Sequence, residues 1–366
     1  MASRIASRAR VVPVAMLRRF TVRRRRPQAP GSILVAHHLL LGDTLMLTPL
    51  LAKLREQHPT ATIAMTVRKA VAPLYSGRPY GVEPLAFDPR DPGTLAALLD
   101  GPGFDLAYVP GDNRTSWLAA AAGARWIVAH AGDRPAYKNW PVDELRPWPD
   151  VPAAWGDMVA ALADGPSPRP YNGADWPDPV HAPFALPEGR YAVLHVGAST
   201  PLKRWGPEKW RSLADGLSAK GFAIVWSAGV GEEAEVPMLD PVGCECSFAG
   251  QLDLAQLWHL VKGASLLVCP DTGVAHLGRL AGTPTVTLFG PGSAVLCGAG
   301  EFWREAPYRT VTVEDFNCRD QRVLFKRNIA WVRRCGRAIA ECPAPRCMQV
   351  ISTDAVATAA LALACG

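Results

Sequence analysis

The strand-to-helix turn at Asp271 constrains the fold of this chain more than any other feature. An apolar run at 265–269 predicts a buried parallel strand, and a helical pattern follows it directly. Thr272 and Gly273 therefore lie at a helix N-terminus, where free N–H groups and the helix dipole favour a phosphate. His276 lies one turn further into the helix. The alternative is that Asp271 or Thr272 simply caps the helix.

A second turn of the same kind lies earlier in the chain. The segment 191–198 predicts a buried strand that runs into a glycine turn, and a helix is predicted from about residue 207. The loop between them holds Ser199, Thr200 and Lys203. Two anion-binding turns in one α/β domain fit a nucleoside diphosphate better than two unrelated caps.

A third strand-to-helix turn lies near the start. A short strand at 33–36 precedes Gly42, Asp43 and Thr44, and an apolar helical stripe follows. His38 lies just ahead of this turn. The sequence leaves two roles open for Asp43, since a carboxylate at this position either caps the helix or acts as a general base.

Taken in order, these segments resemble family 9 glycosyltransferases, the ADP-heptose:lipopolysaccharide heptosyltransferases and their relatives. The resemblance rests on Leu41-Gly42-Asp43-Thr44-Leu45-Met46-Leu47-Thr48-Pro49-Leu50, on His195-Val196-Gly197-Ala198 with Lys203-Arg204-Trp205, and on Asp271-Thr272-Gly273-Val274-Ala275-His276-Leu277 with Gly282-Thr283-Pro284-Thr285. It covers roughly residues 31–295. Each motif alone is weak evidence for the family, but the occurrence of all three in the same order is strong evidence for it.

The alternation of strands and helices predicts an α/β fold, and the resemblance implies the GT-B architecture, with two Rossmann-like doubly wound domains facing across a cleft. Six prolines between residues 166 and 183 indicate a linker region. We expect a basic, disordered tail at 1–30, an N-terminal acceptor-side domain at 31–178, a linker at 179–188, a C-terminal nucleotide-sugar-binding domain at 189–349, and a C-terminal helix at 350–366 that packs back on the first domain.

The resemblance also implies an activity. It predicts an inverting glycosyltransferase that moves a heptose or related sugar from an ADP-sugar to a lipopolysaccharide core or similar glycan. The alternative is a catalytically silent nucleotide-sugar-binding or scaffold protein of the same fold. No cofactor is expected, because the chain shows no convincing DxD pair for a divalent ion.

The site residues follow from the three turns and the resemblance. The predicted general base is Asp43, and the acceptor-side residues are His38, Gly42 and Thr44. The donor diphosphate is assigned to Ser199, Thr200, Lys203, Asp271, Thr272, Gly273 and His276. Glu232 or Glu233 follows a strand near the place of the family's acidic ribose contact, and Glu232 is the preferred candidate.

Positive charge is concentrated at the N-terminus. Residues 1–26 contain nine arginines and no acid, so the remainder has 39 − 9 = 30 basic against 33 acidic residues. The tail is interpreted either as a disordered leader or as an anchor on anionic lipid. Without a small-residue cleavage site it is not expected to be a secretory signal, and no apolar run approaches the length of a membrane span. We expect a cytoplasmic protein, peripheral at the inner face of the membrane, with no nucleic-acid partner.

Four of the nine cysteines lie in a basic C-terminal segment: Cys318, Cys335, Cys342 and Cys347. No Cys-x-x-Cys pair is present, which weakens a prediction of zinc binding. An odd number of cysteines without a signal sequence is typical of a reducing compartment, where disulfides are not expected. Unligated thiols are the default interpretation, and a structural metal site is the alternative.

Overall fold

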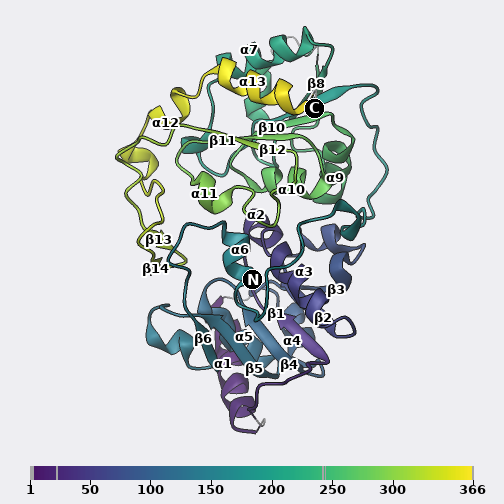
Figure 1. Cartoon of the computed structure of the whole chain (residues 1–366). Coiled ribbons are helices and arrows are strands. Elements are labelled where there is room, and N and C mark those ends of the chain that lie inside the picture. Colours follow the sequence, from purple (N-terminus) through teal and green to yellow (C-terminus); the bar gives the residue numbers. More distant parts are fainter. Residues whose placement is uncertain (1–3, 22–23, 241–242, 244, 365–366) are drawn as a thin grey trace. The chain divides into compact units, whose positions relative to one another are not determined.

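The computed structural model describes residues 4–21, 24–240, 243 and 245–364. The chain divides into two compact units (Figure 1). The first unit comprises Met1–Arg169 together with Val323–Trp331, and the second comprises Pro170–Arg322 together with Val332–Gly366.

The first unit is built on a six-stranded parallel sheet in the order β3-β2-β1-β4-β5-β6. Its strands are β1 (Ser32–Val35), β2 (Thr62–Val67), β3 (Val82–Ala86), β4 (Phe104–Val109), β5 (Ala124–His130) and β6 (Glu144–Arg146). Its helices include α2 (Leu41–Leu45), α3 (Thr48–Gln57), α4 (Pro92–Leu99), α5 (Ser116–Ala121) and α6 (Trp155–Ala160). At the sheet centre Ile33 pairs with Ile63 and with Leu106, and all three side chains are buried.

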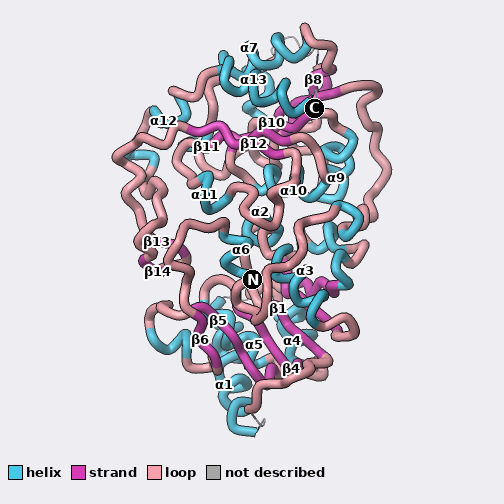
Figure 2. Tube along the Cα trace, viewed as in Figure 1, coloured by secondary structure: helices cyan, strands magenta, loops and turns pink. Residues whose placement is uncertain are grey.

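The second unit repeats this arrangement with the order β12-β11-β10-β7-β8-β9. Its strands are β7 (Tyr191–His195), β8 (Ala223–Ser227), β9 (Cys246–Ser247), β10 (Leu266–Pro270), β11 (Thr285–Phe289) and β12 (Tyr308–Thr312). Its helices include α7 (Pro207–Ser218), α8 (Val236–Leu239), α9 (Leu254–Gly263), α10 (Gly273–Ala281), α11 (Ala294–Cys297), α12 (Arg346–Gln349) and α13 (Thr353–Ala364). The alternation of strand and helix along the chain is visible in Figure 2.

Each sheet has the doubly wound order 3-2-1-4-5-6 when its strands are renumbered within the unit. The strand order reverses between β1 and β4 in the first unit and between β7 and β10 in the second. The predicted α/β class is confirmed, and so are the strands expected from the long apolar runs. The outer strands β6, β9 and β12 were not predicted from the sequence, because they are partly exposed and carry weaker apolar patterns.

The prediction of a disordered N-terminal tail is wrong over the part that the structure describes. Residues Arg4–Thr21 form helix α1, which packs on α5 and fully buries Ala15. The guanidinium of Arg18 donates to the carbonyls of Leu99 and Ala121, at the C-terminal ends of α4 and α5. Arginine is favourable there because the last carbonyls of a helix lack intrahelical partners. The arginine-rich composition of the tail hid this packing role.

The prediction that the C-terminal helix packs back on the first domain also needs correction. Helix α13 packs on α7 and on strands β10 to β12 of its own unit, with Val356 and Ala360 fully buried. Its alanine-rich face allows close approach to the sheet. The helix therefore completes the core of the second unit.

The expected domain boundary at residue 178 moves to 169/170. Trp176 is buried and stacks on Trp258 of α9, with ring centroids 5.7 Å apart, and Asp178 pairs with Lys262. The proline-rich segment therefore packs on the second unit mainly through the stacked tryptophans. A count of prolines does not predict this contact.

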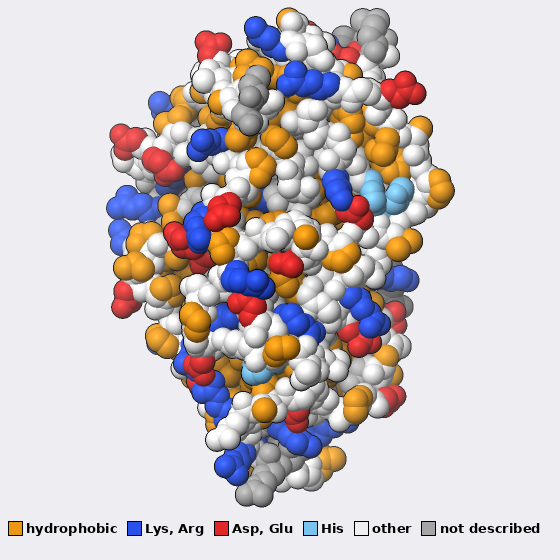
Figure 3. Space-filling model, turned by 45° about the vertical axis from the view of Figure 1, so that its right-hand side comes forward, with side chains coloured by type: hydrophobic (Ala, Val, Ile, Leu, Met, Phe, Trp, Pro, Cys, Tyr) orange, Lys and Arg blue, Asp and Glu red, His pale blue; other side chains and the backbone are white. Residues whose placement is uncertain are grey.

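None of the helices in the described part of the chain combines the length and the apolar character that a membrane span requires. Basic and acidic side chains are interspersed on the face shown in Figure 3, in keeping with the near balance of charge after residue 26.

Candidate functional site

The candidate site lies where the strand order of the second sheet reverses. The loop after β7 and the loop after β10 meet through Lys203, which ends a short 3-10 turn (Pro201–Lys203). Its Nζ donates to the backbone oxygen of Asp271 at 2.6 Å and to the carboxylate Oδ2 at 2.9 Å. In doubly wound sheets this crevice, outside the carboxyl ends of the strands, is the usual ligand position. Two turns far apart in sequence thus form one cationic corner.

Thr272 occupies the N-cap position of α10, yet its side chain makes no capping hydrogen bond. Its Oγ1 is buried, and no hydrogen-bond partner for it is present among the described residues. The neighbouring Asp271 carboxylate is paired with Lys203 instead of capping the helix. Simple capping is therefore excluded for both residues. An unpartnered buried hydroxyl at a helix N-terminus is a donor available to an anion.

His276 is buried one turn into α10, beside Arg279. Because a guanidinium only donates, the imidazole Nδ1 accepts from Arg279 and the neutral ring carries its proton on Nε2. Burial first, and then the positive charges of Arg279 and Lys203, hold the pKa of His276 well below 6.5. His276 is thus a neutral hydrogen-bonding group in this corner.

The two hydroxyl residues of the β7 loop differ in role. Thr200 accepts a long hydrogen bond of 3.4 Å from the backbone N–H of Leu202 and caps the 3-10 turn. Ser199 is exposed in the same loop. Thr200 therefore shapes the loop that carries Lys203, whereas Ser199 is an exposed residue of that loop.

Glu232 and Glu233, the two candidates for the nucleoside contact, separate clearly in the structure. The Glu232 carboxylate accepts from the N–H of Gly229 at 3.0 Å and lies against Gly197, where an added Cβ would come within 2.1 Å of Oε2. Glu232 thus reaches from the β8 loop to the end of β7. Glu233 is exposed and turns to the N–H of Gly231. The arrangement favours Glu232 over Glu233.

Asp43 lies in the first turn of α2, in the loop region after β1 of the first unit. The N-cap position of this helix is Leu40, and no side-chain capping bond is formed there. Gly42 is part of the same turn, and the Thr44 hydroxyl donates back to the Leu40 carbonyl at 2.8 Å. Thr44 is therefore a packing residue of α2, while Asp43 is partly exposed at its start.

The half-buried His38 ring meets Phe87 edge to face at 5.9 Å. Its neighbour His37 is buried, and its backbone N–H and C=O both bond to the Thr66 hydroxyl at 2.7 Å. The path of the chain between β1 and α2 is thereby fixed ahead of Asp43.

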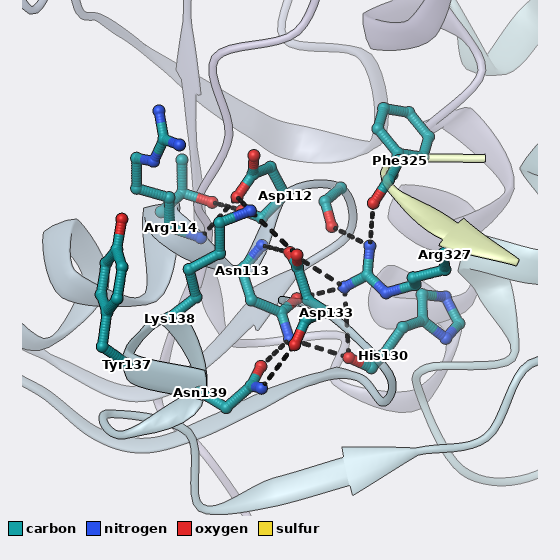
Figure 4. Close-up of polar contacts among 12 residues, drawn as sticks. Asp112, Asn113, Arg114, His130, Asp133, Tyr137, Lys138, Asn139, Phe325 and Arg327 are labelled. Carbon is teal, nitrogen blue, oxygen red and sulfur yellow. Dashed lines mark hydrogen bonds and ion pairs between the residues drawn. The ribbon is translucent and has the colours of Figure 1, made fainter. Parts of the chain in front are cut away.

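A buried polar network in the first unit was not predicted from the sequence (Figure 4). Lys138 is fully buried and pairs with Asp112 and Asp133, each at 2.8 Å. Asp133 also accepts from the backbone N–H of Asn113 at 2.8 Å. Arg327, from the hairpin β13 (Val323–Leu324) and β14 (Arg327–Asn328), donates to the Asn113 side chain at 2.6 Å. The network lies beyond the carboxyl ends of β4 and β5.

The members of this network satisfy one another. The remaining guanidinium donors of Arg327 reach the carbonyls of Gly111 and Ala131 at 3.0 and 2.8 Å. Burial is the largest single influence on Asp112 and opposes its ionisation, but the hydrogen bonds from Lys138 and the Arg114 N–H, together with the charges of both residues, leave the pKa of Asp112 lowered. A network with its charges paired internally holds loops in place and has little capacity left for a ligand.

The described residues contain no group of three or more His, Cys, Asp or Glu side chains arranged to hold a metal ion. At its switch point the second unit presents the Lys203 ammonium, the N–H groups at the start of α10, the Thr272 hydroxyl and the neutral His276 imidazole. Together with the repeated doubly wound sheet, these features describe a two-unit α/β protein whose second unit has a candidate anion-binding corner.

The family model for glycosyltransferase family 9 (heptosyltransferase) matches residues 109–310. This is more than half of the chain, and the protein belongs to that family of glycosyltransferases.

Individual relatives are more distant. Lipopolysaccharide heptosyltransferase 1 of Pseudomonas aeruginosa is 29% identical over 157 residues, 40% of this chain and 44% of the relative. The chain thus spans less than half the length of the curated relatives it matches. The structure of Escherichia coli ADP-heptose lps heptosyltransferase II matches with a TM-score of 0.69 at 17% identity, covering 91% of this chain and 98% of the other. An E. coli heptosyltransferase solved with ADP-2-deoxy-2-fluoro heptose matches with a TM-score of 0.62 at 17% identity, covering 76% and 92%. At these identities the two structures establish the fold.

Proposed function

We propose that this protein is an inverting glycosyltransferase that moves a heptose, or a related sugar, from an ADP-sugar to a lipopolysaccharide core or similar glycan. The observation that carries the proposal is the corner formed by Lys203 and the N-terminus of α10, with the unpartnered Thr272 hydroxyl inside it. The family membership and the donor analogue bound by a relative of the same fold support the same assignment.

The donor diphosphate is assigned to the second unit. Lys203 supplies a point charge to the leaving phosphate, and the N–H groups at Gly273 supply oriented dipoles. The Thr272 hydroxyl and the neutral His276 ring add uncharged donors. This combination stabilises the charge that develops on the departing diphosphate. Glu232 is assigned to the ribose hydroxyls, because a carboxylate beside the end of β7 suits two adjacent O–H donors.

Asp43 is assigned as the general base. It accepts the proton of the acceptor hydroxyl while that oxygen forms a bond to the anomeric carbon of the sugar. The bond from the anomeric carbon to the diphosphate oxygen breaks with its electron pair, and ADP departs. A single displacement of this kind inverts the anomeric centre. Such a base contributes about 10²–10⁴-fold to the rate.

The test compares the parent with Asp43→Asn, using ADP-heptose as donor and heptose-deficient lipopolysaccharide core as acceptor. We expect the parent to release ADP in step with acceptor glycosylation, and NMR of the product to show an inverted anomeric configuration. Asp43→Asn should bind ADP within a few-fold of the parent and lose about 10²–10⁴-fold in turnover.

Each part of the proposal has its own contradicting result. Near-parental turnover in Asp43→Asn rules out its role as base. A parent that binds ADP-heptose tightly but transfers nothing to any lipopolysaccharide core tried supports the silent binding protein instead. Retention of configuration rules out the single displacement.

We further propose that α1 holds the protein against the inner face of the membrane. The helix buries Ala15 against α5 and leaves Met16, Leu17 and Phe20 exposed by 45%, 64% and 89%. Several basic residues that the sequence offered for lipid are engaged in the first unit instead: Arg18, Arg19, Arg24 and Arg26. The contact is therefore assigned mainly to the exposed apolar side chains of α1, which suit the boundary between headgroups and acyl chains.

Substituting two exposed side chains tests this contact without removing the packed helix. Leu17→Glu/Phe20→Glu should abolish sedimentation with vesicles containing anionic lipid while the melting temperature stays within a few degrees of the parent. The matched control Leu40→Glu changes another exposed leucine, 59% accessible and outside α1, and should keep vesicle binding. Equal sedimentation of all three proteins would contradict the proposal.

A further inference from the structure

The segment between β12 and α12 has little regular structure of its own. Residues 313–345 contain only the short hairpin β13–β14 and one 3-10 turn (Ile339–Glu341), and Figure 2 draws the rest as loop. Within it the chain leaves the second unit, contributes Val323–Trp331 to the first unit, and returns. Loops of this length inside a compact fold are uncommon and require an additional means of fixation.

Three cysteines of this segment and one at the start of α12 line one cavity of the second unit. The cavity has a volume of about 390 Å³, and its walls include Cys318, Cys335, Cys342 and Cys347. Cys318 precedes the excursion, which is the stretch Val323–Trp331 that belongs to the first unit, and Cys335 follows it. Cys342 comes directly after the 3-10 turn, and Cys347 lies at the start of α12. All four are free thiols, whereas the other described cysteines, Cys246, Cys269 and Cys297, do not line this cavity.

The surroundings of these sulfurs suit thiolates that are held by a cation. The backbone N–H of Arg337 points at the Cys335 Sγ at 3.4 Å, a contact that stabilises a sulfur carrying negative charge. Mutual repulsion of four thiolates in one cavity is relieved by a bound metal dication.

We propose that Cys318, Cys335, Cys342 and Cys347 form a tetrathiolate site for one thiophilic divalent metal ion, zinc or ferrous iron. Four cysteine sulfurs in tetrahedral geometry are the ligand set that both ions accept in proteins. On binding, each S–H bond breaks, the proton passes to water, and the sulfur electron pair is donated to the metal. No such set is preformed in the described chain, so the loop closes on the ion as it binds.

The location gives this site a structural effect. Cys318 and Cys335 flank the excursion that delivers Arg327 to the first unit, and Gln321 and Arg334 already pair there through two backbone hydrogen bonds of 3.0 and 3.2 Å. A metal at the base of the excursion fixes both of its ends. The site therefore adds to the few buried apolar side chains of this segment, such as Ile329 and Val332.

The cavity also adjoins the candidate donor corner. Pro291 lines the cavity, and the next residue, Gly292, lies so close to Asp271 that an added Cβ would come within 2.2 Å of its carboxylate. Loss of the metal is expected to loosen this loop and to weaken ADP binding several-fold. This last effect rests on the proposed donor site, while the metal site itself does not.

The experiment uses the full chain purified anaerobically with reductant, followed by elemental analysis by mass spectrometry. We expect about one zinc or iron per chain in the parent and in Cys246→Ser, a matched control on strand β9. Cys335→Ser and Cys342→Ser should each retain less than a fifth of that metal. Replacement by Co²⁺ should give the intense sulfur-to-metal charge-transfer bands and the visible absorption of a tetrahedral tetrathiolate.

Reactivity of the thiols separates this proposal from its alternatives even where a variant folds poorly. In the metal-bound parent, four thiols should resist Ellman's reagent until a chelator is added. Four thiols that react freely in a metal-free protein would overturn the proposal, and so would a mass lower by four hydrogens, which indicates two disulfides. Metal loss with unchanged ADP affinity would contradict only the link to the donor corner.

Discussion

The same doubly wound sheet occurs twice in this chain, and the charged clusters beyond its strand ends have opposite characters in the two units. Beyond the ends of β4 and β5 in the first unit, Lys138 and Arg327 both pair with Asp133, and Arg327 also donates to a backbone carbonyl (Figure 4). At the end of β10 in the second unit, Lys203 has one carboxylate partner and is partly exposed, and the Thr272 hydroxyl has no partner among the described residues. The comparison indicates why only the second cluster is a candidate ligand site, since its donors are left available.

The closed network should dominate stability. Lys138→Met removes the cation from between the buried carboxylate of Asp133 and the partly exposed carboxylate of Asp112, and breaking the buried pair on one side costs about 3–5 kcal/mol. We expect that loss in the free energy of unfolding, measured by urea denaturation, with ADP affinity unchanged in protein that remains folded. The double variant Lys138→Met/Asp133→Asn should recover part of the loss. A cost below about 1 kcal/mol would show that water replaces the missing ammonium and that the network is open.

The open corner should respond in the opposite way. Lys203→Met is expected to weaken ADP binding about 10–100-fold, equivalent to about 1.4–2.7 kcal/mol, and to change the free energy of unfolding by less than about 1 kcal/mol. Isothermal titration with ADP and with adenosine measures both ligands. Adenosine, which lacks phosphate, should bind parent and variant alike.

The control for this prediction is Lys209→Met. Lys209 lies in the first turn of α7 and donates to the Ile351 carbonyl at 2.9 Å. It should leave ADP affinity unchanged. If adenosine and ADP lose affinity equally in Lys203→Met, the lysine supports the loop and does not contact the diphosphate.

The residues of the open corner could be predicted from the sequence, but those of the closed network could not, for a physical reason. Lys203, Asp271 and Thr272 lie in short strand-to-helix turns, where local sequence determines which N–H groups and side chains are exposed. The network depends on Arg327, which arrives from a hairpin that is remote in sequence from Asp133. No local periodicity or motif encodes such a long-range pairing.

The same distinction applies to the helices. The core strands were predictable because β1 and β10 are continuous apolar runs buried on both faces. The packing of α1 was not, because the role of Arg18 at the ends of α4 and α5 becomes visible only when those ends are brought together. The composition of the tail indicated a charged, solvent-exposed segment. In the structure the Arg18 guanidinium instead donates to the last carbonyls of two helices that are distant in sequence.

Both units should share one response to acid. Burial and the nearby Arg327 lower the pKa of His130 in the first unit to about 3, and burial lowers that of His195 in the second unit to about 4. Below the unfolded value of about 6.5 the unfolded chain takes up a proton that the folded chain does not. Stability is therefore fully present above that pH and falls as the pH decreases toward the folded values, by about 1.4 kcal/mol per pH unit for each histidine.

His130→Asn and His195→Asn test this response one unit at a time. Each substitution should lower the slope of unfolding free energy against pH, between pH 6 and 4.5, by about 1.4 kcal/mol per pH unit. The double variant should lower that slope by the sum of the two effects. An effect confined to one variant would mean that the histidine of the other unit takes up its proton without unfolding.

The smallest predicted effect separates a ligand group from a structural one most directly. Thr272→Val removes a buried hydroxyl that has no partner among the described residues, so the free energy of unfolding should stay level or rise by up to about 1 kcal/mol. ADP affinity should fall by about 3–10-fold, because the lost hydroxyl is assigned to the diphosphate. Thr283→Val is the matched control, since its buried hydroxyl donates to the Val261 carbonyl at 2.7 Å. That change should cost about 1 kcal/mol of stability and leave ADP affinity intact. Chemical denaturation and ADP titration of the two variants therefore give opposite patterns, and a loss of stability in Thr272→Val would show that its hydroxyl has a structural partner in solution.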